Sequence, residues 1–497
     1  MKLIVKILVV LLLASPCWGD SYYIDFTGGA NTNNGTATGT AWKSHPYMQT
    51  AAACSGTGAA PSYSHSAGDI FYFKGGETWP AECWSMNIGA GGSAGNIDTY
   101  TVDASWYTGG SWTRPVFDGE WVSPSNNSMI RTLGNSYITF NNLELKDMQN
   151  ETAGGSSFII IDGGSNIIIQ NTYMHGWYLK DGITSDDAHG GVYAGNNSSV
   201  TIDSCTISNS EYSETRNSGV AIKGANIVTN TTINNVPSVC LGCTNVSYST
   251  IYNISYPTVD FDVSYHTNGI YQVGSGSVHH NLIYNFSANA APLYPNVCSA
   301  GSGNCKDWTQ YVYDNVVIIP SDDATVPHLI DISTEAADAG PVYGGTIYVY
   351  NNTLVNPQYS SSIRYPVWDG RITIDVADIR NNHIINSDGS GGIGGTAQTE
   401  TVSNNLVQAL ATAASDGYNA GAYHIPTLGS EAGIDAGADV SGTVTDDINS
   451  VSRPQGSAHD IGAYEYGSPT NTITGVTIGN LEATEALISW NRSDGLR

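Results

Sequence analysis

The sequence predicts an all-β protein, specifically a right-handed parallel β-helix of about ten or more coils. First, a segment with alternating apolar residues recurs at intervals near thirty residues. Second, only 12% of residues are charged, against about a quarter in ordinary globular domains, which excludes a helical bundle with a charged surface. Third, the strands in each repeat are too short to bury a face alone, whereas stacked coils share one apolar interior.

Ten segments between residues 137 and 409 share one pattern: an alternating apolar strand, a polar pair that often contains Asn, and a second short strand. The second residues of these pairs are Asn142, Asn171, Ser204, Thr231, Ser249, Asn281, Asn315, Asn352, Asn382 and Asn405. Their spacings vary from 18 to 37 residues, as expected of coils with surface insertions. We expect each Asn to occupy a tight corner in left-handed geometry and to hydrogen-bond its stacked neighbour.

The first nineteen residues are expected to be a secretory signal peptide. Lys2 and Lys6 precede and flank an apolar run, Leu8 to Leu13, and Gly19 offers a small residue before Asp20. No later stretch has the length and apolarity of a transmembrane helix. The sequence therefore predicts a secreted protein.

The remainder divides into three parts. The expected boundaries are 20–130 for N-terminal entry coils and cap, 131–466 for the β-helix with its closing motif, and 467–497 for a linker and the first strands of an incomplete β-sandwich. A solenoid grows by adding coils, so the chain length does not imply several domains.

The formal net charge of −27 becomes −29 when Lys2 and Lys6 leave with the signal peptide. A surface this acidic repels nucleic acid and anionic lipid. It also repels a polyanionic substrate unless Ca²⁺ or a local basic patch intervenes. Solubility in a salty medium explains the same charge without any partner.

Seven cysteines remain after the signal peptide, and export permits disulfides. Cys54 with Cys83 and Cys298 with Cys305 are possible pairs. The Cys240-x-x-Cys243 motif has no second pair at metal-binding spacing, which argues against zinc. The odd number leaves at least one free thiol, and we expect it to be Cys205, buried in a strand.

Together, these features resemble the pectin-lyase-like superfamily of right-handed parallel β-helices, over residues 20–466. The N-terminal stretch with Asp25, Gly28-Gly29 and Trp42 resembles the entry coil of secreted bacterial members. Arg453-Pro454 and the segment from Asp460 to Glu465 are similar to the closing signature of β-helix proteins with a choice-of-anchor Q region, and residues 473–495 look like the start of a fibronectin type III module. The superfamily includes polysaccharide lyases, glycoside hydrolases, epimerases, esterases and adhesins, so fold does not settle function.

The resemblance implies a polysaccharide site on one exposed sheet, built from several coils. Three segments carry charge and align on a Gly-Val or Gly-Ile pair: His189 to Tyr193, Arg216 to Lys223 and His266 to Tyr271. If they are successive coils, His189, Arg216 and His266 lie within about 10 Å, because equivalent residues are about 4.8 Å apart. The catalytic candidates are Lys223, Arg216, His266, His189 and Glu214. The aromatic candidates for sugar binding are Trp177, Tyr193 and Tyr271.

Two mechanisms fit these residues. In a β-eliminating lyase, Lys223 or Arg216 removes the proton α to a uronate carboxyl group, with its pKa lowered by a neighbouring cation. Ca²⁺ neutralises the carboxylate and is held by Asp186, Asp187, Asp260 and Asp262. In a glycoside hydrolase, Asp187 with Glu214 or Asp262 acts as a carboxylate pair.

Each candidate also has a purely structural interpretation. Asp186 and Asp187 are equally suited to cap a turn, Lys223 to be a solvated turn residue, and the aromatic residues to pack in strands. The sequence thus favours a secreted polysaccharide lyase that uses Ca²⁺, with a glycoside hydrolase second. A non-catalytic glycan-binding or adhesion protein is the alternative from another class. We expect a monomer whose partner is a polysaccharide and not a nucleic acid.

Overall fold

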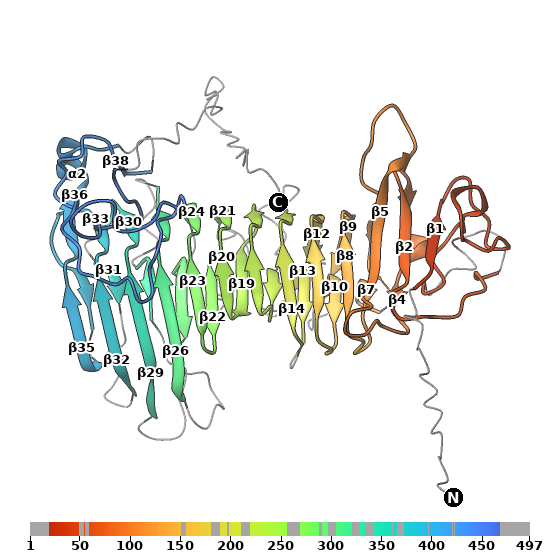
Figure 1. The fold of residues 1–497 in the computed structure, drawn as a ribbon, viewed down its shortest axis with the longest axis horizontal. Coiled ribbons are helices and arrows are strands. Elements are labelled where there is room, and N and C mark those ends of the chain that lie inside the picture. Colours follow the sequence, from red (N-terminus) through yellow and green to blue (C-terminus); the bar gives the residue numbers. More distant parts are fainter. Residues whose placement is uncertain are drawn as a thin grey trace, which may run out of the picture.

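The protein is a right-handed parallel β-helix, seen in a computed structural model that describes residues 19–467 apart from internal segments, the longest being 180–188, 210–218, 256–268, 297–304, 333–341 and 365–371. Three long parallel sheets wind around one axis, and the chain advances along that axis from β1 at one end to β35 at the other (Figure 1). In the described residues sheet A has 13 strands, sheet B has 11 and sheet C has 12.

The strands of each sheet follow in chain order. Sheet A contains β1 (Ser21–Ile24), β2 (Ile70–Gly75), β5 (Asp98–Tyr107), β8 (Ile138–Asn141), β11 (Ile167–Gln170), β14 (Val200–Asp203), β17 (Ile227–Thr229), β20 (Asn245–Ser247), β23 (Gly276–His279), β26 (Cys305–Tyr313), β29 (Val342–Tyr350), β32 (Ile372–Arg380) and β35 (Ala397–Ser403). Sheet C contains β3 (Thr78–Trp79), β6 (Val116–Val122), β9 (Glu144–Asn150), β12 (Tyr173–Leu179), β15 (Thr206–Ser208), β18 (Thr232–Asn234), β21 (Thr250–Ser255), β24 (Leu282–Ser287), β27 (Val316–Ile318), β30 (Thr353–Asn356), β33 (His383–Asn386) and β36 (Leu406–Ala409). Sheet B contains β4 (Met86–Asn87), β7 (Ser128–Arg131), β10 (Ser157–Ile161), β13 (His189–Ala194), β16 (Val220–Lys223), β19 (Ser238–Cys243), β22 (Ile270–Val273), β25 (Leu293–Asn296), β28 (Ile330–Asp331), β31 (Ser361–Arg364) and β34 (Gly392–Gly394).

Each coil runs from sheet A through a tight corner to sheet C, then to sheet B and on to the next strand of sheet A. The alternation of apolar residues creates the interior. On β11, Ile167 and Ile169 point inward and pair in register with Ile138 and Phe140 of β8, and all four side chains are fully buried. One continuous apolar core therefore extends through the stack, as the repeat predicted.

The predicted corner is present, but its two functions belong to two different residues. In seven of the ten pairs the first residue adopts the left-handed conformation, for example Asn351 with φ 51° and Asn381 with φ 60°. The second residue points inward and hydrogen-bonds the next coil, as Asn352 does with Asn382 at 2.9 Å. The repeat pattern had predicted that one residue both forms the left-handed corner and hydrogen-bonds the next coil. In the first three pairs the second residue, Asn142, Asn171 or Ser204, is itself the left-handed one. The inward residue there is the next one along the chain, so the predicted position is wrong by one residue.

The N-terminal region contains a buried tryptophan and a disulfide. Trp42 is fully buried and stacks on Tyr22 with ring centroids 4.7 Å apart. The expected disulfide between Cys54 and Cys83 is present, and Cys205 is a buried free thiol. The two cysteines of the CxxC motif form a disulfide with each other. The pair Cys298 and Cys305 is not settled, because Cys298 lies outside the described residues.

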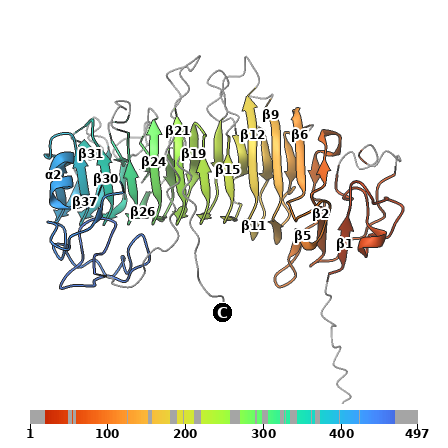
Figure 2. The same cartoon turned by 90° about the horizontal axis from the view of Figure 1, so that it is seen from above.

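The C-terminal part of the chain folds back along the helix. After β36, the short helix α2 (Leu410–Asp416) leads into residues 417–466, which we call the strap; it contains β37 (Tyr418–Asn419) and β38 (Ile425–Pro426). The strap runs beside the last coils (Figure 2). Its Ala438 and Asp460 carbonyls accept hydrogen bonds from the corner residues Asn381 and Asn351. The expected closing motif therefore covers the side of the last coils, and is not a lid over the end of the stack.

Two expectations concern the chain ends. Residues 1–18 of the expected signal peptide, and residues 468–497 with the expected fibronectin-like start, lie outside the described residues. Within the part of the chain that the structure describes, no helix has the length and apolar character needed to cross a membrane.

Candidate functional site

The structure describes only some of the candidate residues. Lys223, Tyr193, Tyr271 and Trp177 are described with their side chains, and His189 is the first residue of β13. The remaining candidates lie outside the described residues, in the connections that lead from sheet C to sheet B: Asp186, Asp187, Glu214, Arg216, Asp260, Asp262 and His266. The calcium ligand set and most of the catalytic set therefore stay predictions.

The predicted stacking of three successive segments is wrong in two respects. On sheet B, Val192 pairs with Ile222 and not with Val220, because a bulge after His189 shifts the register of β13 against β16. In addition, β19 lies between β16 and β22. The sequence alignment missed β19 because its inward residue is Cys240, which does not continue the Gly-Val signal. The segments before β16 and β22 thus belong to coils that are two rungs apart.

The correct register places three of the candidates in one outward-facing row of sheet B. Tyr193 pairs with Lys223, Lys223 with Leu241, and Leu241 with Tyr271. We call this the sheet B row; its members on consecutive rungs are Arg131, Ile160, Tyr193, Lys223, Leu241, Tyr271 and Tyr294. With about 4.8 Å between rungs, Tyr193 and Tyr294 are about 19 Å apart.

The sheet B row combines aromatic rings with one amine. The Lys223 Nζ lies 5.8 Å from the centroid of the Tyr193 ring, and Leu241 is its neighbour on the other side. Two rungs away, the rings of Tyr271 and Tyr294 stack at 5.3 Å with 17° between their planes. The Tyr271 hydroxyl accepts a hydrogen bond from Asn296 Nδ2 at 2.5 Å. Tyr193, Lys223 and Tyr294 are partly exposed, whereas Tyr271 is 7% exposed and supports the Tyr294 ring from the side. The row therefore combines partly exposed aromatic rings with a positive group.

The other described charges on sheet B form ion pairs. Arg131 donates two hydrogen bonds to Asp162, at 2.6 and 2.7 Å. Arg364 on β31 donates two to Asp331 on β28, at 3.1 and 2.8 Å. Each arginine is thereby neutralised by a carboxylate. Lys223 is the lysine of this sheet, and it lies in the middle of the sheet B row.

Tyr294 was missed by the sequence analysis, although a signal for it exists. The row residue follows directly after the inward apolar residue in Val192-Tyr193, Ile222-Lys223, Ile270-Tyr271 and Leu293-Tyr294. This pair is more regular than the Gly-Val pair used for the alignment. Aligning the segments on it would have placed Tyr294 in the row.

Trp177 does not belong to the site. Its side chain is 1% exposed and packs in the apolar core, with its ring edge-on to that of Phe158 at 6.0 Å. A Cβ on Gly190 would lie 2.0 Å from the indole Nε1, so the indole fills the space that this glycine leaves. The prediction that Trp177 binds a sugar is therefore wrong, because no face of its ring is free.

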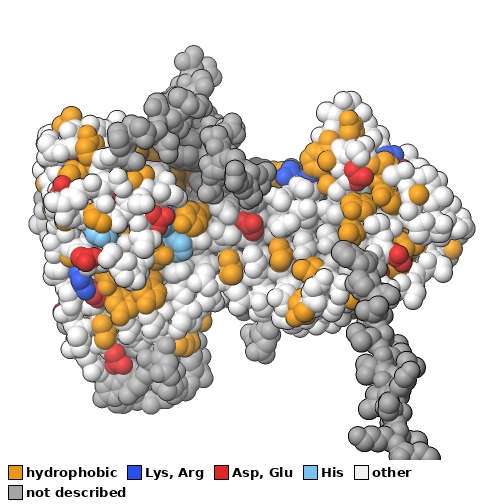
Figure 3. Space-filling view, viewed as in Figure 1, with side chains coloured by type: hydrophobic (Ala, Val, Ile, Leu, Met, Phe, Trp, Pro, Cys, Tyr) orange, Lys and Arg blue, Asp and Glu red, His pale blue; other side chains and the backbone are white. Residues whose placement is uncertain are grey.

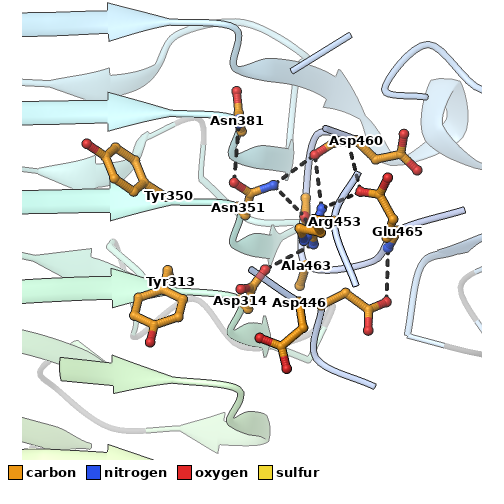
Figure 4. Close-up of polar contacts among 12 residues, drawn as sticks. Tyr313, Asp314, Tyr350, Asn351, Asn381, Asp446, Arg453, Asp460, Ala463 and Glu465 are labelled. Carbon is orange, nitrogen blue, oxygen red and sulfur yellow. Dashed lines mark hydrogen bonds and ion pairs between the residues drawn. The ribbon is translucent and has the colours of Figure 1, made fainter. Parts of the chain in front are cut away.

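A second concentration of charge lies under the strap and is wholly buried. The side chains of Arg453, Asp314 and Glu465 have no exposed surface, and Arg453 contacts each carboxylate at 3.0 Å (Figure 4). Burial raises the pKa of the Asp314 carboxyl well above its usual range, against the opposing effect of Arg453. Burial also raises the pKa of Asp460 to about 6. These groups hold the strap to the corner and are closed to a substrate.

The face of the molecule seen in Figure 3 carries few and scattered charged side chains among a largely uncharged polar surface. Among the residues that the structure describes, no group of three or more His, Cys, Asp or Glu side chains could hold a metal ion. The proposed Ca²⁺ ligands are in connections outside that part of the chain.

Comparisons with known proteins bear on the fold alone. No protein-family model and no curated protein sequence matches the chain. Among solved structures, the pectate lyase Pel9A has a TM-score of 0.42 and 14% identity over 90% of this chain and 96% of that chain. A rhamnogalacturonan lyase has a TM-score of 0.39 and 14% identity over 78% and 87%. A GH136 lacto-N-biosidase from Eubacterium ramulus has a TM-score of 0.40 and 12% identity over 79% and 68%.

Proposed function

We propose that this protein is a secreted enzyme that binds an extended uronic-acid polysaccharide along the sheet B row and cleaves it by β-elimination. The observation that carries the proposal is the position of Lys223 between Tyr193 and the stacked pair of Tyr271 and Tyr294. Sugar rings pack against tyrosine through their C–H groups, and the repeat of the rungs suits a repeating chain.

The chemistry follows from the residue types. Lys223 acts as the base that removes the proton α to the uronate carboxyl group. The bond to the glycosidic oxygen then breaks and leaves an unsaturated sugar, while the departing oxygen takes up a proton from water. The uronate carboxylate needs a cation, since the net charge of −27 repels it. In this proposal Ca²⁺ supplies that charge, held by Asp186, Asp187, Asp260 and Asp262 through hard oxygen ligands.

The glycoside hydrolase is the second candidate. It needs two carboxylates that face the substrate across one bond. Among the described residues of sheet B and its edges, Asp162 and Asp331 are engaged by Arg131 and Arg364. A hydrolase therefore depends on Asp187, Glu214 and Asp262, none of which lies among the described residues. The described part of the row favours an amine base.

The test is an activity screen of uronic-acid polysaccharides with Ca²⁺ and with a chelator. Ultraviolet absorbance of unsaturated products supports the lyase, whereas new reducing ends without that absorbance support the hydrolase. Binding to a glycan without either product supports the adhesion alternative.

The Lys223→Ala variant should lower the elimination rate by about 10²- to 10⁴-fold, the usual contribution of a general base. The matched control is Lys43→Ala, because Lys43 also lies over an aromatic ring, 4.7 Å from the centroid of Phe26, but in the entry region. The control should keep full activity, and both variants should keep the thermal stability of the wild type. Full activity of both Lys223→Ala and Arg216→Ala would exclude this site.

A further inference from the structure

The main-chain nitrogen of Asp20 is bound by a buried carboxylate. Asp69 Oδ1 accepts a hydrogen bond from this nitrogen at 2.8 Å, and Asp69 is fully buried. Its other oxygen accepts hydrogen bonds from the Tyr63 hydroxyl at 2.7 Å and the Ser66 N–H at 3.0 Å. A carboxylate that binds main-chain nitrogen at the start of β1 could simply anchor the first strand, so its surroundings decide what it is suited to hold.

A second buried carboxylate lies beside the first. Asp98 is fully buried and accepts hydrogen bonds from the Gly68 N–H and from His65 Nε2, both at 2.8 Å. Burial and the charge of Asp69 raise its pKa. Among the described residues, no lysine or arginine forms an ion pair with either aspartate, since Lys74 pairs with Asp25 and Glu77. We call these two buried carboxylates and their hydrogen-bond donors the pocket. The pocket thus has more negative than positive charge.

The residue before Asp20 fits only as glycine. A Cβ on Gly19 would lie 1.9 Å from the carbonyl carbon of Gly68 and 2.2 Å from the Asp69 main-chain nitrogen. The Gly19–Asp20 bond is also where the expected signal peptide ends. The point at which the chain enters the pocket therefore coincides with the expected processing site.

We infer that Asp69 and its pocket form the binding site for the α-ammonium group of Asp20 that signal-peptide cleavage creates. Hydrolysis of the Gly19–Asp20 bond by a signal peptidase consumes one water, leaves a carboxylate on Gly19 and an amine on Asp20, and the amine takes up a proton at neutral pH. A neutral amide donor then becomes a charged donor on a buried carboxylate, which is the stronger kind of hydrogen bond. The inference rests on the export signal and not on the sheet B row.

The experiment compares the mature chain beginning at Asp20 with a chain beginning at Gly19, each as wild type and as Asp69→Asn. The chain beginning at Asp20 should melt at least about 2 °C higher than the chain beginning at Gly19. This difference should vanish in Asp69→Asn and persist in the control Asp103→Asn, whose carboxylate accepts a hydrogen bond from the Ser105 N–H on β5. Equal melting of the two wild-type chains, or an unchanged difference in Asp69→Asn, would overturn the inference.

A second measurement needs no substitution at Asp69. Cyanate modifies free α-amines, and mass spectrometry of the N-terminal peptide gives the rate. An ion-paired ammonium in this pocket should react at least tenfold more slowly in the chain beginning at Asp20 than in the chain beginning at Gly19. Equal rates contradict the inference, and so does N-terminal sequencing of the exported protein that finds a start other than Asp20.

Discussion

In the first half of the β-helix left-handed corner residues are open to solvent, whereas in the second half the strap covers the corners that follow β23, β26, β29 and β32. Ser204 and Asn230 are exposed corner residues, whereas His280, Asp314 and Asn351 are at most 4% exposed. The backbone has the same conformation in both halves, with φ between 50° and 56° at these five residues. Corner geometry is therefore set by the coil, and the strap acts only on the choice of side chain.

The inward residues next to these corners differ in the same way. In the first half Thr231 accepts a hydrogen bond from the Cys205 N–H at 3.4 Å. In the second half Asn352 accepts hydrogen bonds from both the main-chain and the side-chain nitrogen of Asn315, at 3.1 and 2.9 Å. A hydroxyl satisfies one main-chain N–H of the adjoining coil, whereas an amide also links the side chains into a ladder. The second half is thus fastened inside by the ladder and outside by the strap.

The largest effect should come from removing the cation under the strap. Arg453→Met leaves the Asp314 carboxylate buried without its partner, which typically costs about 3–5 kcal/mol. Hydrogen exchange should accelerate in the strap and in the corners of β26 to β33, while β8 to β20 keep their protection. The control Arg364→Met removes an arginine that is 45% exposed and should cost less than about 1 kcal/mol. Equal acceleration in both halves would show that the halves are not separate in stability.

Acid should distinguish the halves through His280. Burial is the main cause that lowers the pKa of His280 to about 4, so between pH 6.5 and 4 the unfolded chain binds a proton that the folded chain does not. Stability contributed by the neutral ring is complete above pH 6.5 and is lost as the pH falls through 4. The side chains of His279 and Asp446, the backbone of Asp447 and the Arg453 cation surround the ring.

Comparing His280→Asn with wild type isolates this group, since the other carboxyl groups and histidines are common to both. As the pH falls from 6.5 to 4, the free energy of unfolding of the variant should rise by up to about 3 kcal/mol relative to that of the wild type. The reverse substitution Asn230→His lies at an exposed corner of the first half. The difference in free energy of unfolding between this variant and the wild type should not change with pH. Denaturant unfolding at several pH values measures both, and a pH-independent difference for His280→Asn would contradict the assignment.

The inward ladder gives an intermediate effect. Asn352→Ala removes side-chain hydrogen bonds to Val312, Tyr350 and Asn382 and leaves buried groups without partners, so we expect a loss of about 2 kcal/mol or more. Thr231→Val in the first half should cost about 1 kcal/mol. Denaturant unfolding measures both values. Similar losses at the two positions would mean that the ladder adds nothing to the single hydroxyl bond.

The smallest effect concerns the corner conformation itself. Ser204→Gly removes a side chain from an exposed residue with φ 54° and should stabilise the protein by less than about 1 kcal/mol. Asn351→Gly relieves the strain of the same left-handed conformation but removes the hydrogen bond to the Asp460 carbonyl at 2.8 Å. This substitution should therefore destabilise the protein. The two changes in melting temperature should have opposite signs, and equal signs would show that the strap bond has no net effect.

The candidate site was predictable only in part. Lys223, Tyr193 and Tyr271 were found from the sequence because charge and aromatic residues on a sheet strand stand out in a chain with few charges. Which of them are neighbours on the sheet was not predicted, because a bulge in β13 and the presence of β19 between β16 and β22 change the register. Trp177 was misassigned since burial depends on Gly190, which is far from obvious in the sequence.

By itself, the sequence determined the β-helix, because alternating apolar residues in a repeated unit leave one way to bury them, and it determined the cysteine that stays free. Only the tertiary structure decided which side chains share the sheet B row and where the strap lies. Register depends on bulges and insertions that shift neighbours by one residue or one rung. The strap contacts join residues such as Arg453 and Asp314, which are 139 positions apart, and no local pattern encodes that separation.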